Sequence, residues 1–359
     1  MVALDRLRAW MRAEGVDAAF VTNPVSIAYL TGFAANPHER LMALVLRRDE
    51  AVLVVPGLEA TSAASASRDL TVRAWRDGED AWTSVAAALG GRAGRVAVEK
   101  GHLSLAGWER LRDLTGGAEP VDAGTELRRL RVRKTPEEIA RLERAARLTD
   151  EVAERALVEL RAGRSELEVA SAIDGWIAAV GARLSFETIV QSGANSAQPH
   201  LGPSGRRLQT GDLVLLDFGA ACDGYRADTT RTVVLGEPDV RQREVHELVL
   251  AAHDAAVAAV RPGATVGEVD EAARAVIRAG GLADRFIHRV GHGLGLEAHE
   301  DPSLDPGGAA VLEEGMVVTI EPGVYLPGWG GVRIEDDVAV EAAGARLLTG
   351  ADRTLRSAG

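Results

Sequence analysis

The sequence has little sulfur and no long apolar run. Cys222 is the single cysteine among 359 residues, which excludes an internal disulfide and a zinc site built from cysteines. A lone cysteine is typical of a protein in a reducing compartment. No apolar run approaches the roughly 18 residues that a membrane helix needs, and the N-terminal residues lack the apolar stretch and cleavage site of a signal peptide. We therefore expect a cytoplasmic protein without a membrane partner.

Positive charge is scarce as well. The chain has 41 basic and 53 acidic side chains and a net charge of −12, so we expect no nucleic-acid partner. Apolar residues make up 46% and charged residues 26% of the chain, which is the ordinary balance of a folded protein. At roughly 150 residues per domain, the length predicts two domains or one large one.

The sequence pattern changes near residue 130, which favours two domains. Before it, helical patterns alternate with short apolar runs that predict strands at 18–21, 41–46, 51–55 and 95–98, as in an α/β domain with a buried sheet. After it, Thr135–Glu138 is a capping box with Pro136 at the first helical position, and Ser165–Glu168 is a second one; each predicts the start of a helix. We place the domains at 1–130 and 135–359.

The second half contains an internal repeat. In residues 211–219 and 315–323, a glycine begins an apolar strand, an acid follows six positions later, and a second glycine comes two positions after the acid. Each of these acids has another one 11 or 14 positions downstream. Two matching units predict a pseudo-symmetric domain whose carboxylates converge. The four acids are Asp217, Asp228, Glu321 and Glu335.

The first pair of acids belongs to a predicted hairpin. Asp223-Gly224 is a two-residue turn signal, and counting outward from it puts Asp228 on the same face as Asp217. Two like charges there repel, and apolar flanks add a desolvation cost; a divalent cation between them removes both problems. For a lone hairpin, an acid that faces solvent or pairs with a neighbouring arginine is the better interpretation. The matching second pair of acids favours the metal.

Histidine ligands are expected from the same half of the chain. His292 lies between two glycines, which allow the backbone to approach an ion closely. His288 shares its strand parity, and His200 and His299 lie in segments that could face the same site. The remaining histidines, His38, His102, His246 and His253, are not expected to be metal ligands.

The predicted ligands are four carboxylates and one imidazole: Asp217, Asp228, His292, Glu321 and Glu335. This set has too many oxygens for one zinc ion and suits two divalent ions roughly 3.5–4 Å apart. Such hard ligands favour Mn²⁺, with Co²⁺ or Zn²⁺ as alternatives. A water bridging two such ions loses a proton near neutral pH and becomes a nucleophile, so the predicted chemistry is metal-assisted hydrolysis.

At these residues the sequence resembles the creatinase/aminopeptidase P/prolidase family, the pita-bread metallopeptidases. The resemblance implies an N-terminal creatinase-like α/β domain followed by a pseudo-symmetric pita-bread catalytic domain, and the same five metal ligands. It covers nearly the whole chain. The motifs that carry it are Tyr29–Phe33, Leu216–Gly219, Asp228–Thr232, Gly291–Gly295, Ile320–Gly323 and Val332–Asp336.

The resemblance also implies roles for further residues. His200 and His299 would stabilise the tetrahedral intermediate, and Glu321 would shuttle protons. Three more residues would support the ligands or the proline side of the pocket: His288, Tyr325 and Arg333.

The implied reaction is hydrolysis of an Xaa-Pro bond, with dipeptides favoured as substrates. Residues 36–40 resemble a loop that, in small bacterial prolidases, reaches the partner subunit's active site. We therefore expect a homodimer in which His38 and Arg40 bind the substrate carboxylate, although Asn36 stands where those enzymes often carry Asp. The alternatives are an Xaa-Pro aminopeptidase acting on longer peptides and a non-catalytic binding protein. The latter is disfavoured because no ligand position is lost.

Overall fold

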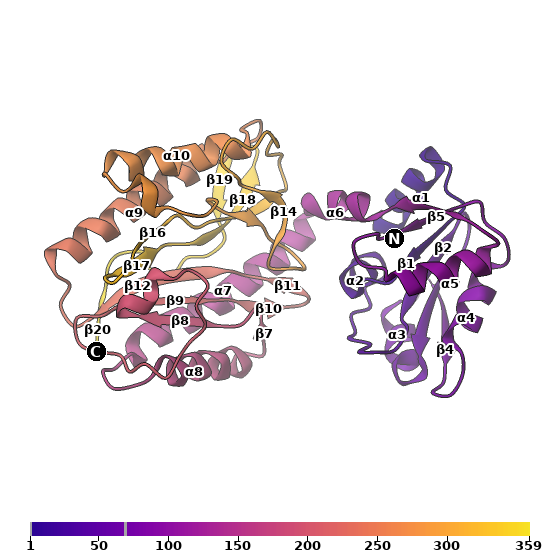
Figure 1. Ribbon diagram of the computed structural model, residues 1–359, viewed down its shortest axis with the longest axis horizontal. Helices are drawn as coiled ribbons and strands as arrows, with labels where there is room; N and C mark the ends of the chain where they lie inside the picture. The colour runs from indigo at the N-terminus through magenta and orange to yellow at the C-terminus, as the bar shows by residue number, and fades with distance from the viewer. Residues whose placement is uncertain (1, 68–69) are drawn as a thin grey trace. The chain divides into compact units, whose positions relative to one another are not determined.

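The computed structural model describes residues 2–67 and 70–359, in two compact units that meet between Arg131 and Val132 (Figure 1). Met1 and residues 68–69 of the predicted first domain lie outside the described residues. Within the described part, no helix is long and apolar enough to cross a membrane.

The N-terminal unit is built on one six-stranded sheet. Its order is β4-β3-β2-β1-β5-β6, and β1 runs antiparallel to β2 and parallel to β5. Four strands lie where they were predicted, whereas β4 and β6 were missed. These two are edge strands with mostly exposed side chains, so they carry no apolar run. The strands are β1 Ala18–Val21, β2 Ala43–Arg47, β3 Ala51–Pro56, β4 Thr71–Trp75, β5 Arg95–Val98 and β6 Glu119–Asp122.

Helices cover both faces of this sheet. Ala19 and Val21 belong to the apolar core that includes the side chains of α1, α2 and α6, whereas Ala18 and Phe20 pack with those of α4 and α5. Because both faces are buried, the four inner strands β1, β2, β3 and β5 are mostly apolar. The helices are α1 Val2–Ala13, α2 Pro24–Thr31, η1 Gly57–Glu59, α3 Ala60–Ala66, α4 Ala81–Leu89, α5 Leu105–Thr115 and α6 Gly124–Val132.

The C-terminal unit repeats a helix pair followed by a sheet (Figure 1). Capping boxes begin α7 at Thr135 and α8 at Ser165, as predicted, and two more begin α9 at Asp239 and α10 at Thr265. The helices are α7 Pro136–Glu159, α8 Glu166–Ala179, η2 Gly193–Ala197, α9 Val240–Ala259, α10 Val266–Ala279 and η3 Ala283–Arg285.

Each repeat has its own sheet and apolar core. The first sheet has the order β20-β12-β9-β8 and the second β14-β13-β15-β18-β19. The strands of the first are β8 Ile189–Ser192, β9 Leu213–Phe218, β12 Thr229–Leu235 and β20 Ser357–Ala358; those of the second are β13 His292–Gly293, β14 Glu300–Ser303, β15 Val317–Ile320, β18 Asp336–Glu341 and β19 Gly344–Leu347. Two small sheets contain β7 Arg183–Leu184, β10 Ala220–Cys222 and β11 Tyr225–Arg226, and β16 Gly323–Leu326 with β17 Gly330–Arg333.

Hydrogen bonds join the two repeats along β12. The Thr232 hydroxyl donates to the Arg333 carbonyl at 3.0 Å, and the Glu335 N–H donates to the Thr230 carbonyl at 3.2 Å. The acid-bearing segments of the two repeats therefore meet, which is the convergence that the repeat in the sequence predicts.

Candidate active site

The first acidic hairpin has the predicted turn and register. Asp223 and Gly224 have φ angles of 51° and 85°, as a two-residue hairpin turn needs, and Cys222 pairs with Tyr225. A Cβ on Gly219 would lie 1.8 Å from the Ala227 carbonyl oxygen, so only glycine fits opposite the return segment.

The hairpin predicts one return strand over residues 225–235, and this is wrong, because the strand is interrupted between Arg226 and Thr229. At the interruption, the Ala220 N–H donates to the Thr149 hydroxyl at 2.9 Å instead of across the hairpin. The Asp228 N–H donates to the Asp337 carboxylate at 3.1 Å, so Asp228 is held at the junction of the two repeats.

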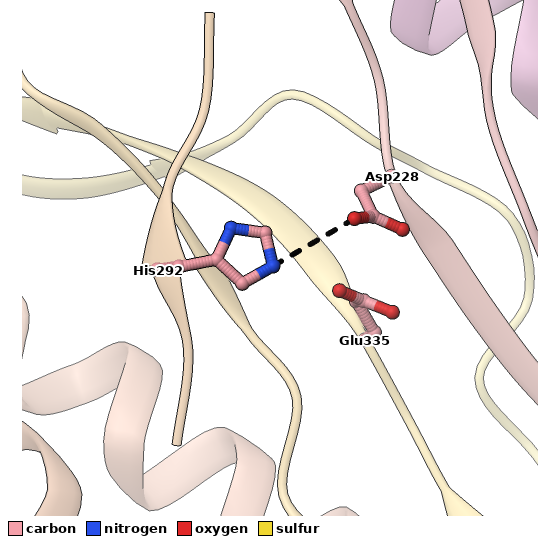
Figure 2. A group of neighbouring side chains, drawn as sticks. All are labelled: Asp228, His292 and Glu335. Carbon is pink, nitrogen blue, oxygen red and sulfur yellow. Dashed lines mark ion pairs between the residues drawn. The ribbon is translucent and has the colours of Figure 1, made fainter. Parts of the chain in front are cut away.

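Three predicted ligands form a compact buried group. One ligand atom each from Asp228, His292 and Glu335 lies within 4.8 Å of the other two, and the three side chains point toward one another (Figure 2). His292 Nε2 is 3.8 Å from Asp228 Oδ2 and 3.3 Å from the nearer oxygen of Glu321. The carboxylates therefore gather around one imidazole nitrogen.

The protonation of His292 suits a metal ligand. Its Nδ1 lies 3.0 Å from the Gly293 carbonyl oxygen, so Nδ1 carries the proton and the Nε2 lone pair faces the carboxylates. Burial lowers the pKa of His292 to about 4, which keeps the ring neutral. A Cβ on Gly291 would lie 1.9 Å from the Thr319 carbonyl oxygen, so this glycine allows close approach of a neighbouring strand; the predicted close approach to an ion stays a prediction.

The carboxylates lack the partners that buried acids normally have. Oδ1 of Asp217 and Oδ1 of Asp228 are buried, and neither has a hydrogen-bond partner in the described part of the chain. Burial raises the pKa of Asp228 and Glu335 well above the usual range, and their acidic neighbours raise it further. Divalent cations would bind the orphaned oxygens and offset the repulsion, so the residues present fit a metal centre.

A buried arginine holds Asp217. Arg333 donates to Asp217 Oδ2 and, at 3.0 Å, to the Thr230 hydroxyl. That hydroxyl in turn donates to Glu335 Oε2 at 2.5 Å. Arg333 thereby fixes one acid from each repeat.

Tyr325 and His288 extend this chain of hydrogen bonds. His288 Nδ1 lies 2.7 Å from the Arg289 carbonyl oxygen, so its Nε2 accepts the Tyr325 hydroxyl at 2.9 Å. The same hydroxyl accepts from Arg333 at 3.1 Å. Burial raises the pKa of Tyr325 to about 12, so the hydroxyl stays protonated.

The acids line a cavity of about 580 Å³. All five predicted metal ligands contribute to its wall, as do four further predicted residues, namely His200, His288, His299 and Arg333. Sequence reasoning missed other lining residues, among them Phe186, Ile189, Pro199, Ile287 and Arg289. Ile287 and Arg289 could have been predicted to line the cavity, because they flank the predicted residue His288. No pattern in the sequence pointed to Phe186 or Ile189.

A buried ion pair holds the segment that carries His299. Glu300 Oε1 accepts the backbone N–H groups of Leu296 and Glu297 at 2.9 and 3.2 Å, and Oε2 accepts from Lys134 at 3.2 Å. The Lys134 and Glu300 side chains are only 1% and 5% exposed. The His299 ring is held with its centroid 4.2 Å from that of His292.

His38 and Arg40 belong to the N-terminal unit and make their contacts there. The Asn36 side chain accepts the His38 N–H at 3.0 Å, and His38 has a φ of 53°. Arg40 donates to both oxygens of Asp77 at 3.0 Å and to Glu39 at 2.8 Å. The Arg40 fork is therefore already engaged by a carboxylate.

Comparisons with known proteins match both units. The model of metallopeptidase family M24 matches residues 140–342, and that of the Creatinase/Prolidase N-terminal domain matches residues 4–133. An Xaa-Pro dipeptidase from Lactobacillus helveticus is 39% identical, over 98% of this chain and 98% of its own length.

Solved structures agree with these matches. The prolidase from Pyrococcus furiosus superposes with a TM-score of 0.89 at 37% identity, covering 96% of this chain and 99% of its own. An X-Pro aminopeptidase from Thermotoga maritima also reaches 0.89, at 31% identity and 98% coverage of both chains. Proteins with either name thus share this fold.

Proposed function

Because the chain belongs to metallopeptidase family M24 and carries a Creatinase/Prolidase N-terminal domain, we propose that it hydrolyses Xaa-Pro dipeptides. The family match confirms the resemblance found in the sequence and the two-part fold, a creatinase-like domain and a pita-bread domain, which we assign to 1–130 and 135–359. The observation that carries the proposal is the buried group of Asp228, His292 and Glu335 in a cavity of about 580 Å³. The dipeptidase name of the L. helveticus relative supports the substrate class.

The metal centre of this proposal holds two divalent ions on the predicted set of Asp217, Asp228, His292, Glu321 and Glu335. When bound, such ions activate a water molecule and polarise the scissile carbonyl. Mn²⁺ is favoured by the carboxylate-rich ligands, with Co²⁺ or Zn²⁺ as alternatives. The orphaned oxygens of Asp217 and Asp228 support this assignment.

The chain's own residues supply the remaining chemistry. His200 and His299, which line the cavity, donate to the oxyanion that develops on the substrate carbonyl. Glu321 accepts a proton from the attacking water and delivers it to the departing proline nitrogen. Its oxygen 3.3 Å from His292 Nε2 places it beside the ligand group.

The proline side of the site is assigned to His288, Tyr325 and Arg333. Tyr325 and Arg333 are both 3% exposed, so in this proposal they act by holding Asp217 and His288. His288 contacts the substrate ring, together with apolar walls such as Phe186 and Ile189. Recognition by packing suits proline, whose amide has no N–H to donate.

The preference for dipeptides is assigned to His38 and Arg40 of a neighbouring subunit in a homodimer. Arg40 then exchanges Asp77 for the substrate carboxylate, which its planar fork fits equally well. The second candidate is an Xaa-Pro aminopeptidase. It is favoured by the engagement of Arg40 with Asp77 and by the likeness to the T. maritima enzyme. A cytoplasmic location is supported by the single cysteine, which is free and buried.

The test compares an Xaa-Pro dipeptide, the matching Xaa-Pro-Xaa tripeptide and an Xaa-Ala dipeptide on Mn²⁺-loaded protein of measured metal content. We expect fast turnover of the Xaa-Pro dipeptide alone. Faster turnover of the tripeptide identifies an aminopeptidase, and absence of turnover at two bound ions per chain identifies a binding protein.

A further inference from the structure

The N-terminal unit contains a hollow of about 880 Å³ that none of the predicted site residues line. It exceeds the cavity of the candidate active site, which is about 580 Å³. Arg8 and Arg12 reach it from α1, Arg47 and Arg48 from the end of β2, and Arg92 from the segment before β5. Five arginines from three separate segments thus surround one concave space.

Glycines keep the hollow open between these arginines. Gly15, Gly94, Gly116 and Gly117 line it. A Cβ on Gly116 would lie 2.9 Å from Arg92 Cζ, so a larger residue would displace that guanidinium. In the part of the chain that the structure describes, no aromatic side chain lines the hollow, so these residues offer a nucleobase no ring on which to stack.

Carboxylates do not balance this charge. Among the described residues, Asp17 is the only acid in the lining; its Oδ2 accepts the N–H groups of Gly94 and Arg95 at 2.7 and 3.0 Å, and its charge offsets part of that of Arg47 and Arg95. Arg8 meets Asp5 at 3.4 Å. Among the described residues, no ion pair is found for Arg12 or Arg48. Several guanidinium charges therefore face the space without a counterion.

Two of the arginines are held by backbone carbonyls, which leave their charge in place. Arg47 donates to the Leu89 carbonyl and Arg92 to the Gly116 carbonyl, the latter at 3.0 Å. A guanidinium has five N–H donors, so each has others to offer. The Nε of Arg8 is buried and has no hydrogen-bond partner in the described part of the chain. A buried donor without a partner is uncommon in folded proteins.

We propose that this hollow binds a small phosphate-bearing anion of more than one negative charge, such as a diphosphate group. Guanidinium forks match phosphate oxygens bidentately, and the volume lies in the range of small-molecule sites. With no stacking surface, the phosphates carry the affinity. The site is independent of the proposed peptidase activity.

The test measures pyrophosphate binding to the full chain by calorimetry at physiological salt, which screens diffuse surface attraction. The same titration on the Asp228→Asn variant separates the hollow from any anion bound at the metal centre. We expect one saturable site per chain in both proteins. Absence of a saturable site in both overturns the proposal.

Variants locate the site. Arg8→Gln/Arg12→Gln should weaken pyrophosphate binding by about tenfold or more, because charge-assisted contacts are lost; Arg48→Gln, at an exposed position, should also weaken it. The matched control Arg6→Gln/Arg73→Gln removes two exposed charges elsewhere in the same unit and should leave the affinity unchanged. Equal weakening by the control overturns the proposal.

A parallel titration with ADP tests which molecule carries the bound phosphate groups. Binding no tighter than that of pyrophosphate supports recognition of the phosphates alone. ADP binding tenfold tighter, and lost in Arg8→Gln/Arg12→Gln, supports the site and identifies a nucleoside diphosphate as its source. If wild-type protein binds neither anion and Arg8→Gln/Arg12→Gln changes its sedimentation, the hollow is a protein contact and the proposal is wrong.

Discussion

The two units of the chain carry very different charge. Residues 1–131 contain 17 basic and 17 acidic side chains, whereas residues 132–359 contain 24 and 36. The whole net charge of −12 therefore belongs to the C-terminal unit, which contains the candidate metal centre. Four of the acids of this unit, Asp217, Asp228, Glu321 and Glu335, gather in the wall of one cavity, where like charges repel one another.

Buried carboxylates in the two units differ in their hydrogen-bond partners. In the N-terminal unit, Glu99 is 6% exposed; its carboxylate accepts the Ser26 hydroxyl at 2.6 Å and the Asn23 N–H at 3.2 Å. In the C-terminal unit, Asp217 and Asp228 each keep one buried oxygen without a hydrogen bond. The fold supplies partners to both oxygens of the Glu99 carboxylate, whereas each of these two proposed ligands has one oxygen available for an ion.

The largest expected effect follows from this contrast. Asp228→Asn or Glu335→Gln should abolish turnover of Xaa-Pro dipeptides and lower the metal content, because each removes a charge that holds the ions. Glu99→Gln is the matched control and should keep both ions and activity. The test measures the metal content of each variant by mass spectrometry and its turnover of Xaa-Pro dipeptides. Two bound ions with full activity in Asp228→Asn would refute the ligand assignment.

The next effect concerns stability. Lys134→Met removes the ammonium that pairs with the buried Glu300 carboxylate, and should lower the free energy of unfolding by about 3–5 kcal/mol. The neighbouring Arg133 pairs with Glu313, but both side chains are more than half exposed, so Arg133→Met should cost about 1 kcal/mol or less. Urea unfolding measures both; equal losses would show that burial of the pair has no role.

Replacing the cavity histidines that are not proposed as ligands should leave the metal content unchanged. His200→Ala or His299→Ala should lower kcat by roughly 10²–10³-fold, the usual effect of losing one donor to an oxyanion, at near-normal metal content. His102→Ala, in the N-terminal unit, is the control and should change neither quantity. Loss of ions in His299→Ala would mean that a ligand has been misassigned.

A smaller effect depends on pH. Burial lowers the pKa of His246 to about 4, whereas the pKa of a histidine in an unfolded chain is about 6.5. As pH falls from 6.5 to 4, the unfolded state binds a proton that the folded state does not, so stability decreases by up to about 3 kcal/mol. His246→Gln should flatten this decline, whereas the exposed His102→Gln should not. Parallel slopes in wild type and His246→Gln would contradict the assignment.

The smallest expected effect tests whether the N-terminal unit contributes to specificity. His38→Ala/Arg40→Ala should raise the KM for dipeptides well beyond a few-fold, and the KM for tripeptides less. Arg110→Ala, which breaks the exposed pair with Asp80, is the control. Equal changes for both substrates, or a fully active monomer in sedimentation, would leave the Arg40–Asp77 pair as a surface contact only.

Features encoded by neighbouring residues could be predicted from the sequence. The capping boxes at Thr135 and Ser165 and the turn at Asp223-Gly224 depend on side chains a few positions apart. The contact of the Asp228 N–H with Asp337 could not be predicted, because the two residues are 109 positions apart in the sequence. The same holds for the engagement of Arg40 by Asp77 and for Phe186 in the cavity wall, which depend on packing between distant segments.

The turn at Asp223-Gly224 sets the spacing between two of the proposed ligands. Side chains alternate along a strand, so one inserted residue would turn the return segment over and carry the Asp228 carboxylate to the opposite face. A substitution in the turn would add local strain at a positive φ but keep the register. We therefore expect natural variation in this hairpin to be constrained in length more than in composition; a one-residue gap there would predict loss of the proposed metal centre even where every acid is retained.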